Sequence, residues 1–420
     1  MKMKILTKII VTLIIVIISL AGVTIVALFK DNEYINSHIK FKEFRINGLD
    51  HYIMKDDDKL YCIFSKLNSS FIDYYLYEFD GNTLEISNET YLCTYEYSIS
   101  PAVHNDKIYW IYNASFIFIM NLSTKKIYSV NLSQFGITAA DYLYVCDRGI
   151  YLVGVKIENE SSEIKFMHYL FFFDKIFKNY SITFNLSHIG INLQAVKDDG
   201  KIYMWHSPDG YTEVLILSED GKLLKHYQLE GYSYWMVKKD SFLILYARVF
   251  LDDLSYKMVI YRIDTLTNQI KIINTTEEKT PLHSIYDPNS KEIWGFSLKR
   301  PCRVTEDAST KIKFYYSKDG LNFSPGLYLE IPGLCEYLGD LSMYQYTFYN
   351  NSLYILLYVY DPKIKESAIG ILKIEDYSNT LKYIPLLDRL KVYIIPITVI
   401  LLVILVGYSV YLVNNASPEH

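Results

Sequence analysis

A polar turn followed by a β-strand recurs seven times along this 420-residue chain, and this repeat limits the folds that the chain can adopt. Four copies are clear: DDKLYCIF, NDKIYWIY, DRGIYLVG and DGKIYMWH. Three weaker copies follow: KDSFLILY, NSKEIWGF and NNSLYILL. One position in each copy is an aromatic or aliphatic anchor: Tyr61, Tyr109, Tyr151, Tyr203, Leu243, Ile293 and Tyr354. The mean spacing of about 50 residues is long enough for one supersecondary unit per copy.

A second hairpin follows each copy, for example YYLYEFDGNTLEIS from Tyr74 and IGILKIEDYSNTLKYI from Ile369. Two hairpins per copy make four strands, and the 41 tyrosines of the chain favour a β-rich fold. We therefore predict an all-β fold, a seven-bladed β-propeller. The repeat resembles the four-stranded blades of kelch-type and other divergent propellers. It lacks the Gly-Gly pair of kelch blades and the Trp-Asp of WD40 blades, so the resemblance implies an architecture rather than a family. Two stacked β-sandwich domains are the alternative.

Apolar segments lie near both ends of the chain. Residues 5–29 are long enough to cross a bilayer of about 30 Å, and Lys2, Lys4 and Lys8 favour a cytoplasmic N-terminus. A cleaved signal peptide is the alternative. Residues 392–413 form a second apolar segment. Its flanking Arg389 and Lys391 contradict the charge rule, so we let the first segment set the orientation.

These segments predict a cell-membrane protein with four parts. They are a transmembrane anchor at residues 1–30, an extracellular propeller at 31–390, a transmembrane helix at 391–413 and a cytoplasmic tail at 414–420. Both termini are then expected in the cytoplasm. The two ends of the propeller should emerge close together, because a closed ring brings its first and last strands into one blade.

Asn-x-Ser/Thr triplets are abundant in the part predicted to be external, whereas composition alone predicts about three in the whole chain. The candidate glycosylation sites are Asn68, Asn88, Asn113, Asn121, Asn131, Asn159, Asn179, Asn185, Asn274, Asn322 and Asn350. Their number indicates an exported glycoprotein. The dense triplets and the high content of Ile, Lys, Asn and Tyr together make the chain similar to an archaeal envelope protein.

Five cysteines are compatible with two disulfides and one unpaired thiol. Cys302 with Cys335 is the first candidate pair, and Cys62 with Cys93 the second. Cys146 is expected to be a small buried hydrophobic residue. No pair has the close spacing of a zinc site, so no metal or cofactor is expected.

The innermost strand of each blade should line the central channel of the ring. Counting back from the seven anchors places one polar residue per blade at an equivalent position: His51, Ser100, Asp141, Gln194, Ser233, His283 and Gln345. This ring could bind a small polar ligand or a cation. The alternative is a solvated channel wall without a ligand.

The distribution of the triplets indicates where a partner could dock. Eight of the eleven lie between Asn68 and Asn185, and none lies between residues 186 and 273. Because glycans occlude protein contacts, blades 4 and 5 are the expected docking surface. The candidate anchors are Trp205, Tyr211, Tyr232, Tyr234 and Trp235. The alternative is that these aromatic residues belong to the sheet core.

The expected function is that of a non-catalytic cell-surface binding or scaffolding protein that contacts another envelope protein or a surface glycan. The net charge of −5, without a basic cluster, argues against nucleic acid. An extracellular carbohydrate-active hydrolase is the first alternative, but it would need paired carboxylates, and Asp141 is the one acid among the channel positions. SKDGLNF, from Ser317 to Phe323, resembles a turn of sialidase-like propellers and is expected to be structural. The second alternative is an accessory subunit of a membrane transport or secretion complex.

Overall fold

The computed structural model describes most of the chain in two units. Met1–Lys40 and Lys382–His420 form one unit, and Phe41–Leu381 form the other. The described residues are 2–44, 51–56, 59–68, 71–95, 101–160, 163–186, 194–207, 210–251, 255–275, 283–287, 290–298, 309–332, 335–336, 345–361 and 366–415.

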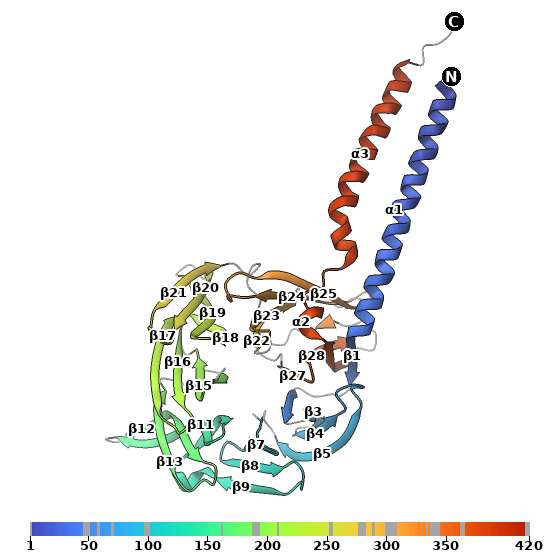
Figure 1. The fold of residues 1–420 in the computed structure, drawn as a ribbon. Helices are drawn as coiled ribbons and strands as arrows, with labels where there is room; N and C mark the ends of the chain where they lie inside the picture. The colour runs from blue at the N-terminus through green and yellow to red at the C-terminus, as the bar shows by residue number, and fades with distance from the viewer. Residues whose placement is uncertain are drawn as a thin grey trace. The chain divides into compact units, whose positions relative to one another are not determined.

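The larger unit contains seven antiparallel sheets arranged in a ring (Figure 1). Each sheet is one blade, and blades 1–6 have four strands in sequence order. Blade 1 contains β2 (His51–Asp56), β3 (Lys59–Asn68), β4 (Phe71–Phe79) and β5 (Ile86–Tyr95); blade 2 contains β6 (Ala102–Val103), β7 (Lys107–Tyr112), β8 (Phe116–Asn121) and β9 (Ile127–Asn131), followed by the 3-10 helix η1 (Leu132–Phe135); blade 3 contains β10 (Ala139–Val145), β11 (Gly149–Glu160), β12 (Glu163–Asp174) and β13 (Tyr180–Leu186). Blade 4 contains β14 (Gln194–Asp198), β15 (Lys201–His206), β16 (Tyr211–Ser218) and β17 (Leu223–Glu230); blade 5 contains β18 (Tyr232–Lys239), β19 (Phe242–Phe250), β20 (Tyr256–Asp264) and β21 (Ile270–Thr275); blade 6 contains β22 (His283–Asp287), β23 (Glu292–Leu298), β24 (Ser309–Ser317) and β25 (Ser324–Pro332).

Blade 7 closes the ring by joining the two ends of the propeller. It contains β26 (Cys335–Glu336), β27 (Gln345–Tyr349), β28 (Ser352–Asp361) and β29 (Glu366–Glu375), and its outermost strand is β1 (Ile39–Phe44), which pairs with β29. The prediction of a seven-bladed propeller is therefore confirmed, and the sandwich alternative is wrong. Each predicted anchor lies on the second strand of its blade.

The predicted seventh hairpin is wrong, because the chain turns into the short helix α2 (Tyr377–Thr380) after β29. Asp376 has a positive φ of 43°, and the Thr380 hydroxyl donates a hydrogen bond to the carbonyl oxygen of Glu375 at 2.8 Å. The Tyr377 side chain is buried, with its ring 4.8 Å from that of Phe348. These contacts end the sheet and leave the fourth position of blade 7 to β1.

The turns of each blade define two faces of the ring. We call face A the side where the first strand turns into the second and the third into the fourth; face B carries the hairpins between the second and third strands and the links between blades. On face A, a carboxylate at the end of the third strand accepts backbone N–H groups of the next turn. Asp80, Asp264 and Asp319 each bind the N–H groups two and three residues further on. These are Asx turns, which SKDGLNF exemplifies in blade 6.

Tyrosine hydroxyls connect some blades to the next. Tyr354 in blade 7 donates to the carbonyl oxygen of Gly81 in blade 1 at 2.6 Å, and Tyr246 in blade 5 donates to that of Gly320 in blade 6 at 3.1 Å. Tyr151 in blade 3 donates to Ser218 in blade 4 in the same way. Each bond satisfies a buried hydroxyl, so these contacts fix the spacing of the blades at face A.

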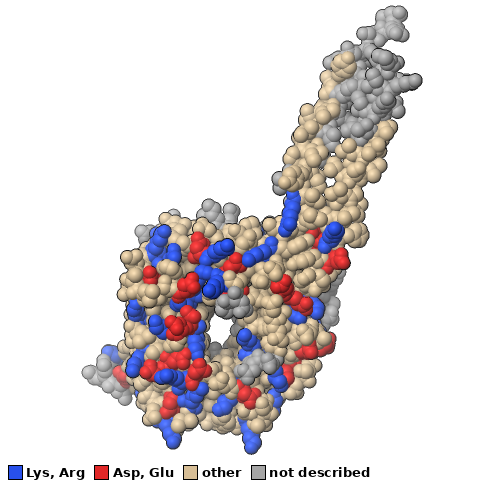
Figure 2. Space-filling view, in the orientation of Figure 1, with Lys and Arg blue, Asp and Glu red and all other residues tan. Residues whose placement is uncertain are grey.

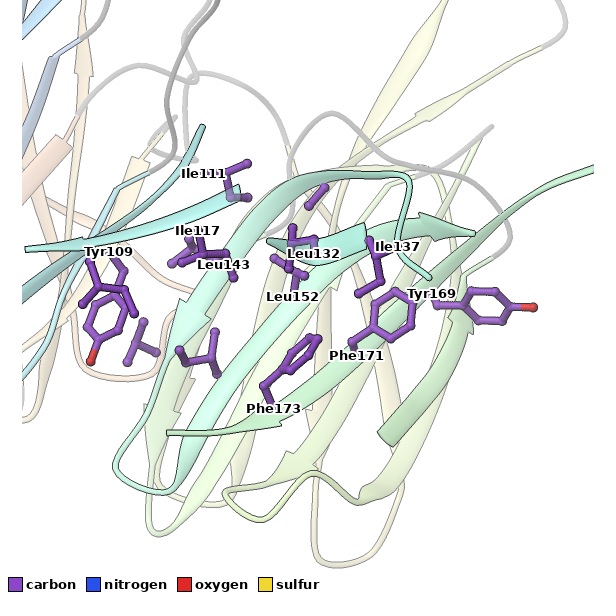
Figure 3. Close-up of a cluster of buried hydrophobic side chains, with 14 residues drawn as sticks. Tyr109, Ile111, Ile117, Leu132, Ile137, Leu143, Leu152, Tyr169, Phe171 and Phe173 are labelled. Carbon is purple, nitrogen blue, oxygen red and sulfur yellow. The ribbon is translucent and has the colours of Figure 1, made fainter. Parts of the chain in front are cut away.

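The hydrophobic core is divided into clusters between neighbouring blades. Figure 3 shows the cluster between blades 2 and 3, where Ile117 and Leu132 face Leu152 and Phe171. All four side chains are fully buried. A blade cannot bury both faces alone, so the ring is expected to fold cooperatively.

The smaller unit consists of two helices, α1 (Lys2–His38) and α3 (Leu386–Asn415), which contact each other. Asp31 of α1 is buried, and one of its carboxylate oxygens accepts the Tyr383 hydroxyl at 2.6 Å and the Leu386 backbone N–H at 2.7 Å. The rings of Tyr34 and Tyr383 stack at 4.0 Å. Both helices extend beyond the predicted boundaries at residues 30 and 391, since α1 ends at His38 and α3 begins at Leu386. Among the described residues, the segment Ile14–His38, with a mean hydropathy of 2.2, is long and apolar enough to cross a membrane.

Candidate interaction surface

The structure places the described members of the predicted channel ring on the innermost strands. His51, Gln194, His283 and Gln345 begin β2, β14, β22 and β27, and Asp141 and Ser233 lie on β10 and β18. Ser100 lies outside the described residues. The innermost strands of several neighbouring blades contact each other, and Figure 2 shows an opening in the middle of the ring. For His51, His283 and Gln345 the structure describes the backbone and not the side chain.

Ser233 does not line the channel as predicted, since its side chain is only 5% exposed. Its hydroxyl lies 3.2 Å and 3.3 Å from the carbonyl oxygens of Trp235 and Tyr246. Its N–H is shared between the hydroxyls of Ser207 and Thr212, at 3.0 and 2.8 Å. A serine whose hydrogen bonds are used within the sheet supports the link between blades 4 and 5 instead of binding a ligand.

Two other channel positions have described side chains, Asp141 and Gln194, and they lie in different environments. The Asp141 side chain remains accessible to solvent. Desolvation by the surrounding protein nevertheless raises its pKa, and the nearby His168 opposes that shift. Gln194 is half-buried opposite Trp205. The sequence missed that aromatic rings reach between innermost strands: Trp235 of blade 5 lies 6.0 Å from Tyr346 of blade 7. Among the described residues, no group of three or more His, Cys, Asp and Glu side chains could hold a metal ion.

Exposed apolar residues gather at hairpin tips on face B. They are Leu67 and Phe71 in blade 1, Ile157 and Phe166 in blade 3, and Phe250, Leu251 and Tyr256 in blade 5. The tips of blades 1 and 3 also carry the candidate glycosylation sites Asn68 and Asn159, whereas residues 250–256 contain none. The blade 5 tip is therefore the one of these three that a predicted glycan would not shield.

Five side chains at the blade 5 tip touch one another, and we call Tyr232, Tyr234, Arg248, Phe250 and Tyr256 the aromatic cluster. Phe250 meets Tyr232 edge-on with ring centroids 5.5 Å apart, and Tyr256 at 6.1 Å. The Arg248 guanidinium lies 5.0 Å from the centre of the Tyr256 ring and 5.5 Å from that of Tyr234. Edge-to-face and cation–π contacts of this kind hold exposed rings in fixed orientations.

The backbone below Tyr232 is held by a compact set of hydrogen bonds. Gly231 has a φ of +90°, and its N–H donates to the carbonyl oxygen of Gly210 at 2.8 Å. The Thr212 hydroxyl donates to the Gly231 carbonyl oxygen at 2.8 Å, and Tyr261 donates to that of Glu230 at 2.7 Å. These bonds join the end of blade 4 to the start of blade 5 and place Tyr232 beside Phe250.

The five predicted docking residues separate into different environments. Tyr232 and Tyr234 belong to the aromatic cluster, and Tyr211 is half-buried at the start of β16. Trp205 is only 2% exposed in the core between blades 4 and 5, so its prediction as a surface anchor is wrong. Trp235 is half-buried next to Tyr346. The sequence signal for Phe250 and Tyr256 was available, since apolar residues on both sides of the acidic turn FLDDLSY indicate a hairpin tip.

A buried contact between a histidine and a glutamate lies close to this surface in blade 4. The Nε2 atom of His206 is 2.6 Å from Glu213 Oε2, and both side chains are less than 10% exposed. His226 Nε2 lies 3.6 Å from the other oxygen of Glu213, and its ring contacts Phe184 of blade 3 at 4.8 Å. Such a carboxylate depends on its imidazole partners, because a buried unpaired charge is costly.

The predicted Cys62–Cys93 disulfide is wrong. Both cysteines are free, and Cys62 faces the core toward blade 7 whereas Cys93 faces the core toward blade 2. The two side chains therefore lie on opposite faces of one sheet. Cys146 is free and buried, as expected. Cys302 lies outside the described residues, as does the side chain of Cys335, so their pairing stays a prediction.

The candidate glycosylation sites differ in how their side chains are used. Asn88, Asn113, Asn131, Asn185, Asn274 and Asn350 are exposed. The amide nitrogens of Asn68, Asn121, Asn179 and Asn322 donate to nearby aspartates at 2.8 to 3.2 Å. The Asn159 side chain lies outside the described residues. Glycosylation of any of these sites stays a prediction.

The strand pairing defines the class of this protein as a seven-bladed β-propeller with four-stranded blades. No protein-family model and no curated protein matches the chain. Solved structures with a similar ring include BamB from Moraxella catarrhalis, with a TM-score of 0.41, 10% identity, and 79% of this chain and 97% of that chain covered. They also include the N-terminal domain of Nup159 (0.40, 7%, 80% and 96%) and the dihydro-heme d1 dehydrogenase NirN (0.41, 12%, 75% and 73%). At these values the assignment of the fold rests on the strand pairing of this chain.

Proposed function

We propose that this protein is a non-catalytic, membrane-anchored binding or scaffolding protein that docks another envelope protein through the aromatic cluster of blade 5. The observation that carries the proposal is the exposed, mutually braced set of Tyr232, Phe250 and Tyr256 at a hairpin tip without a glycosylation triplet. Tyrosine and arginine are enriched among the residues that dominate interface energies. Rings held in place before binding lose little conformational entropy on contact.

The position of the cluster on face B supports this role. The outermost strand of each blade starts at face A, and β1 takes that position in blade 7. β29 also ends at face A, where the Asn351 side chain meets Asp376 at 3.5 Å. The two ends of the propeller unit thus belong to face A, and a partner can approach the cluster on face B without meeting them.

The helical unit supports the anchoring part of the proposal. We assign both α1 and α3 to the membrane, with the N-terminal lysines in the cytoplasm and the propeller outside as a surface glycoprotein of the archaeal envelope type. The Asp31 contacts with Tyr383 and Leu386 would hold the outer ends of the two helices together.

A matched pair of variants tests the proposed docking. Phe250→Ala removes the centre of the cluster, and Phe166→Ala removes a ring of similar exposure, 62% against 55%, from the blade 3 tip. The full-length proteins are purified from native membranes in mild detergent, and co-purified proteins are quantified by mass spectrometry. We expect one stoichiometric partner to be lost with Phe250→Ala and kept with Phe166→Ala. Equal retention by both variants would contradict the proposal.

A further inference from the structure

A groove between blades 5 and 6 lies on the same face of the blade 5 sheet as the aromatic cluster. It has a volume of about 670 Å³, within the range of small-ligand sites. Its lining includes Ile260, Ile273 and Thr275 of blade 5 and Lys313, Tyr315, Leu321, Asn322 and Phe323 of blade 6. Ile260 and Ile273 are cross-strand partners, and Phe323 packs against the same core cluster. The floor of the groove is therefore the outer part of the core between these two blades.

The strand register connects the groove to the aromatic cluster. β19 and β20 pair without a bulge, so their cross-strand pairs form successive rows on each face of the sheet. From the tip inward, the rows on the face toward blade 6 are Phe250 with Tyr256, Arg248 with Met258, and Tyr246 with Ile260. The third row borders the groove and lies about 13 Å from the tip, at about 3.3 Å per residue. About four residues of extended chain can therefore span from the cluster to the groove.

Lys313 gives the groove a positive charge. It is the one charged residue among the described residues that line the groove, and its ammonium lies 5.0 Å from the centre of the Tyr315 ring. No carboxylate of the described residues pairs with Lys313, whereas Lys311 is paired with Glu330 at 3.6 Å. At the cluster end of the same face, Arg248 adds a second cation. A segment with acidic side chains would be attracted at both ends of this path.

We propose that the partner docked at the aromatic cluster extends an acidic segment into this groove and places a carboxylate at Lys313. Apolar side chains of the segment would cover Ile273 and Phe323, which are only partly buried, and remove them from water. Contact in the groove forms within a molecule already held at the cluster, so a high effective concentration favours it. This inference rests on the docking proposed above and names the chemistry of the segment that docks.

Zero-length cross-linking with a water-soluble carbodiimide tests the inference, because it joins a lysine amine to a carboxylate in direct contact with it. The complex is treated after purification from native membranes in mild detergent, and the groups joined to each lysine are identified by mass spectrometry. We expect Lys313 to be joined to an aspartate or glutamate of the partner that Phe250→Ala releases. Lys165, which is exposed on the blade 3 hairpin, is the control and should not be joined to that partner.

Two variants of Lys313 provide the matched comparison, because its side chain is exposed and melting curves can confirm that both variants fold. Lys313→Glu should weaken partner affinity several-fold through like-charge repulsion, and Lys313→Arg should stay within about twofold of the wild type. A Lys313 that is not cross-linked, one joined to a sugar acid, or wild-type affinity of Lys313→Glu would overturn the inference, and loss of the partner with Phe250→Ala would leave the proposed docking standing. Retention of the partner by both Phe250→Ala and Lys313→Glu would overturn both proposals.

Discussion

The hairpin tips of blades 3 and 5 both expose a phenylalanine on face B, but among the described residues only that of blade 5 contacts other aromatic rings. In blade 3, β11 and β12 pair beyond the ends of β10 and β13, so Ile157 and Phe166 lie on a two-stranded arm that projects from the ring (Figure 1). In blade 5, Phe250 is supported by Tyr232 from the innermost strand and by Tyr256 across the hairpin. Support from neighbouring strands therefore distinguishes the proposed docking surface at blade 5 from the exposed aromatic residue of blade 3.

The largest effect is expected from the buried contact between His206 and Glu213 next to the aromatic cluster. Glu213→Ala leaves His206 buried without its carboxylate, and removal of one partner of such a pair costs about 3–5 kcal/mol of unfolding free energy. In blade 3, Glu158→Ala removes one half-buried acceptor of the Tyr169 hydroxyl, and we expect a loss of about 1 kcal/mol. Urea unfolding of the full-length variants in detergent measures both. Equal losses of unfolding free energy in the two variants would contradict the expectation that blade 4 depends on buried polar contacts more than blade 3 does.

The backbone below Tyr232 provides the next contrast. A Cβ atom at Gly231 would lie 2.5 Å from the carbonyl oxygen of Arg248, whereas a Cβ at Gly210 meets nothing within 4 Å, although both glycines have φ near +90°. Gly210→Ala should cost about 1 kcal/mol of strain, and Gly231→Ala about 2–3 kcal/mol. Gly231→Ala should also displace Tyr232 and weaken partner retention. Thermal melting and pull-down of the two variants check this, and a loss of partner with Gly210→Ala alone would refute it.

The Arg248 side chain tests whether the cluster acts through its planar stacking. Arg248→Lys keeps the positive charge and loses the guanidinium that lies over Tyr234 and Tyr256. We expect the binding free energy to weaken by about 1 kcal/mol, roughly a fivefold loss of affinity, with an unchanged melting temperature. Interferometry with the isolated partner provides the measurement. Lys165→Ala on the blade 3 arm serves as the control and should leave the affinity unchanged.

The smallest effect concerns the turn of blade 6 and its dependence on pH. The pKa of Asp319 is about 2 in the folded chain against an ordinary value of 3.8, so its stabilising contribution is present above pH 4 and is lost as the pH falls from 4 to 2. Because the side chain is largely exposed, the contribution should be about 1 kcal/mol. Asp319→Asn should reduce the slope of unfolding free energy against pH in that window. An unchanged slope would show that the turn does not hold this carboxylate ionised.

The sequence predicted the ring because the turn and strand motif is local and repeats seven times. It also predicted that the first and last strands of the ring meet in one blade, which the pairing of β1 with β29 confirms. It did not predict that β1 supplies the outermost strand in place of a seventh hairpin, since nothing in the residues of β1 specifies pairing with a strand more than 300 residues further along the chain. The DYSNT segment resembled a hairpin turn and forms α2 instead, because Tyr377 finds a buried position next to Phe348.

The candidate site was harder to predict, because it also depends on contacts between residues that are far apart in the sequence. Ser233 is polar and lies on an innermost strand, but its N–H binds Thr212 from the preceding blade, a contact that spacing does not reveal. Tryptophan is a residue type that is common in interfaces, but Trp205 is buried like a core residue. The sequence showed that residues 186–273 contain no glycosylation triplet. The contact between Phe250 and Tyr232 could not be predicted, because it depends on the pairing of β18 with β19.

Hydroxyl-radical footprinting of the complex isolated from native membranes tests the proposed docking surface most directly. Modification of Tyr232, Phe250 and Tyr256 is compared between the free protein and the complex, with Phe166 as the internal reference. We expect the three cluster residues to be protected in the complex and Phe166 to react equally in both samples. Protection of Phe166 with an unprotected Phe250 would contradict the assignment of blade 5 as the docking surface.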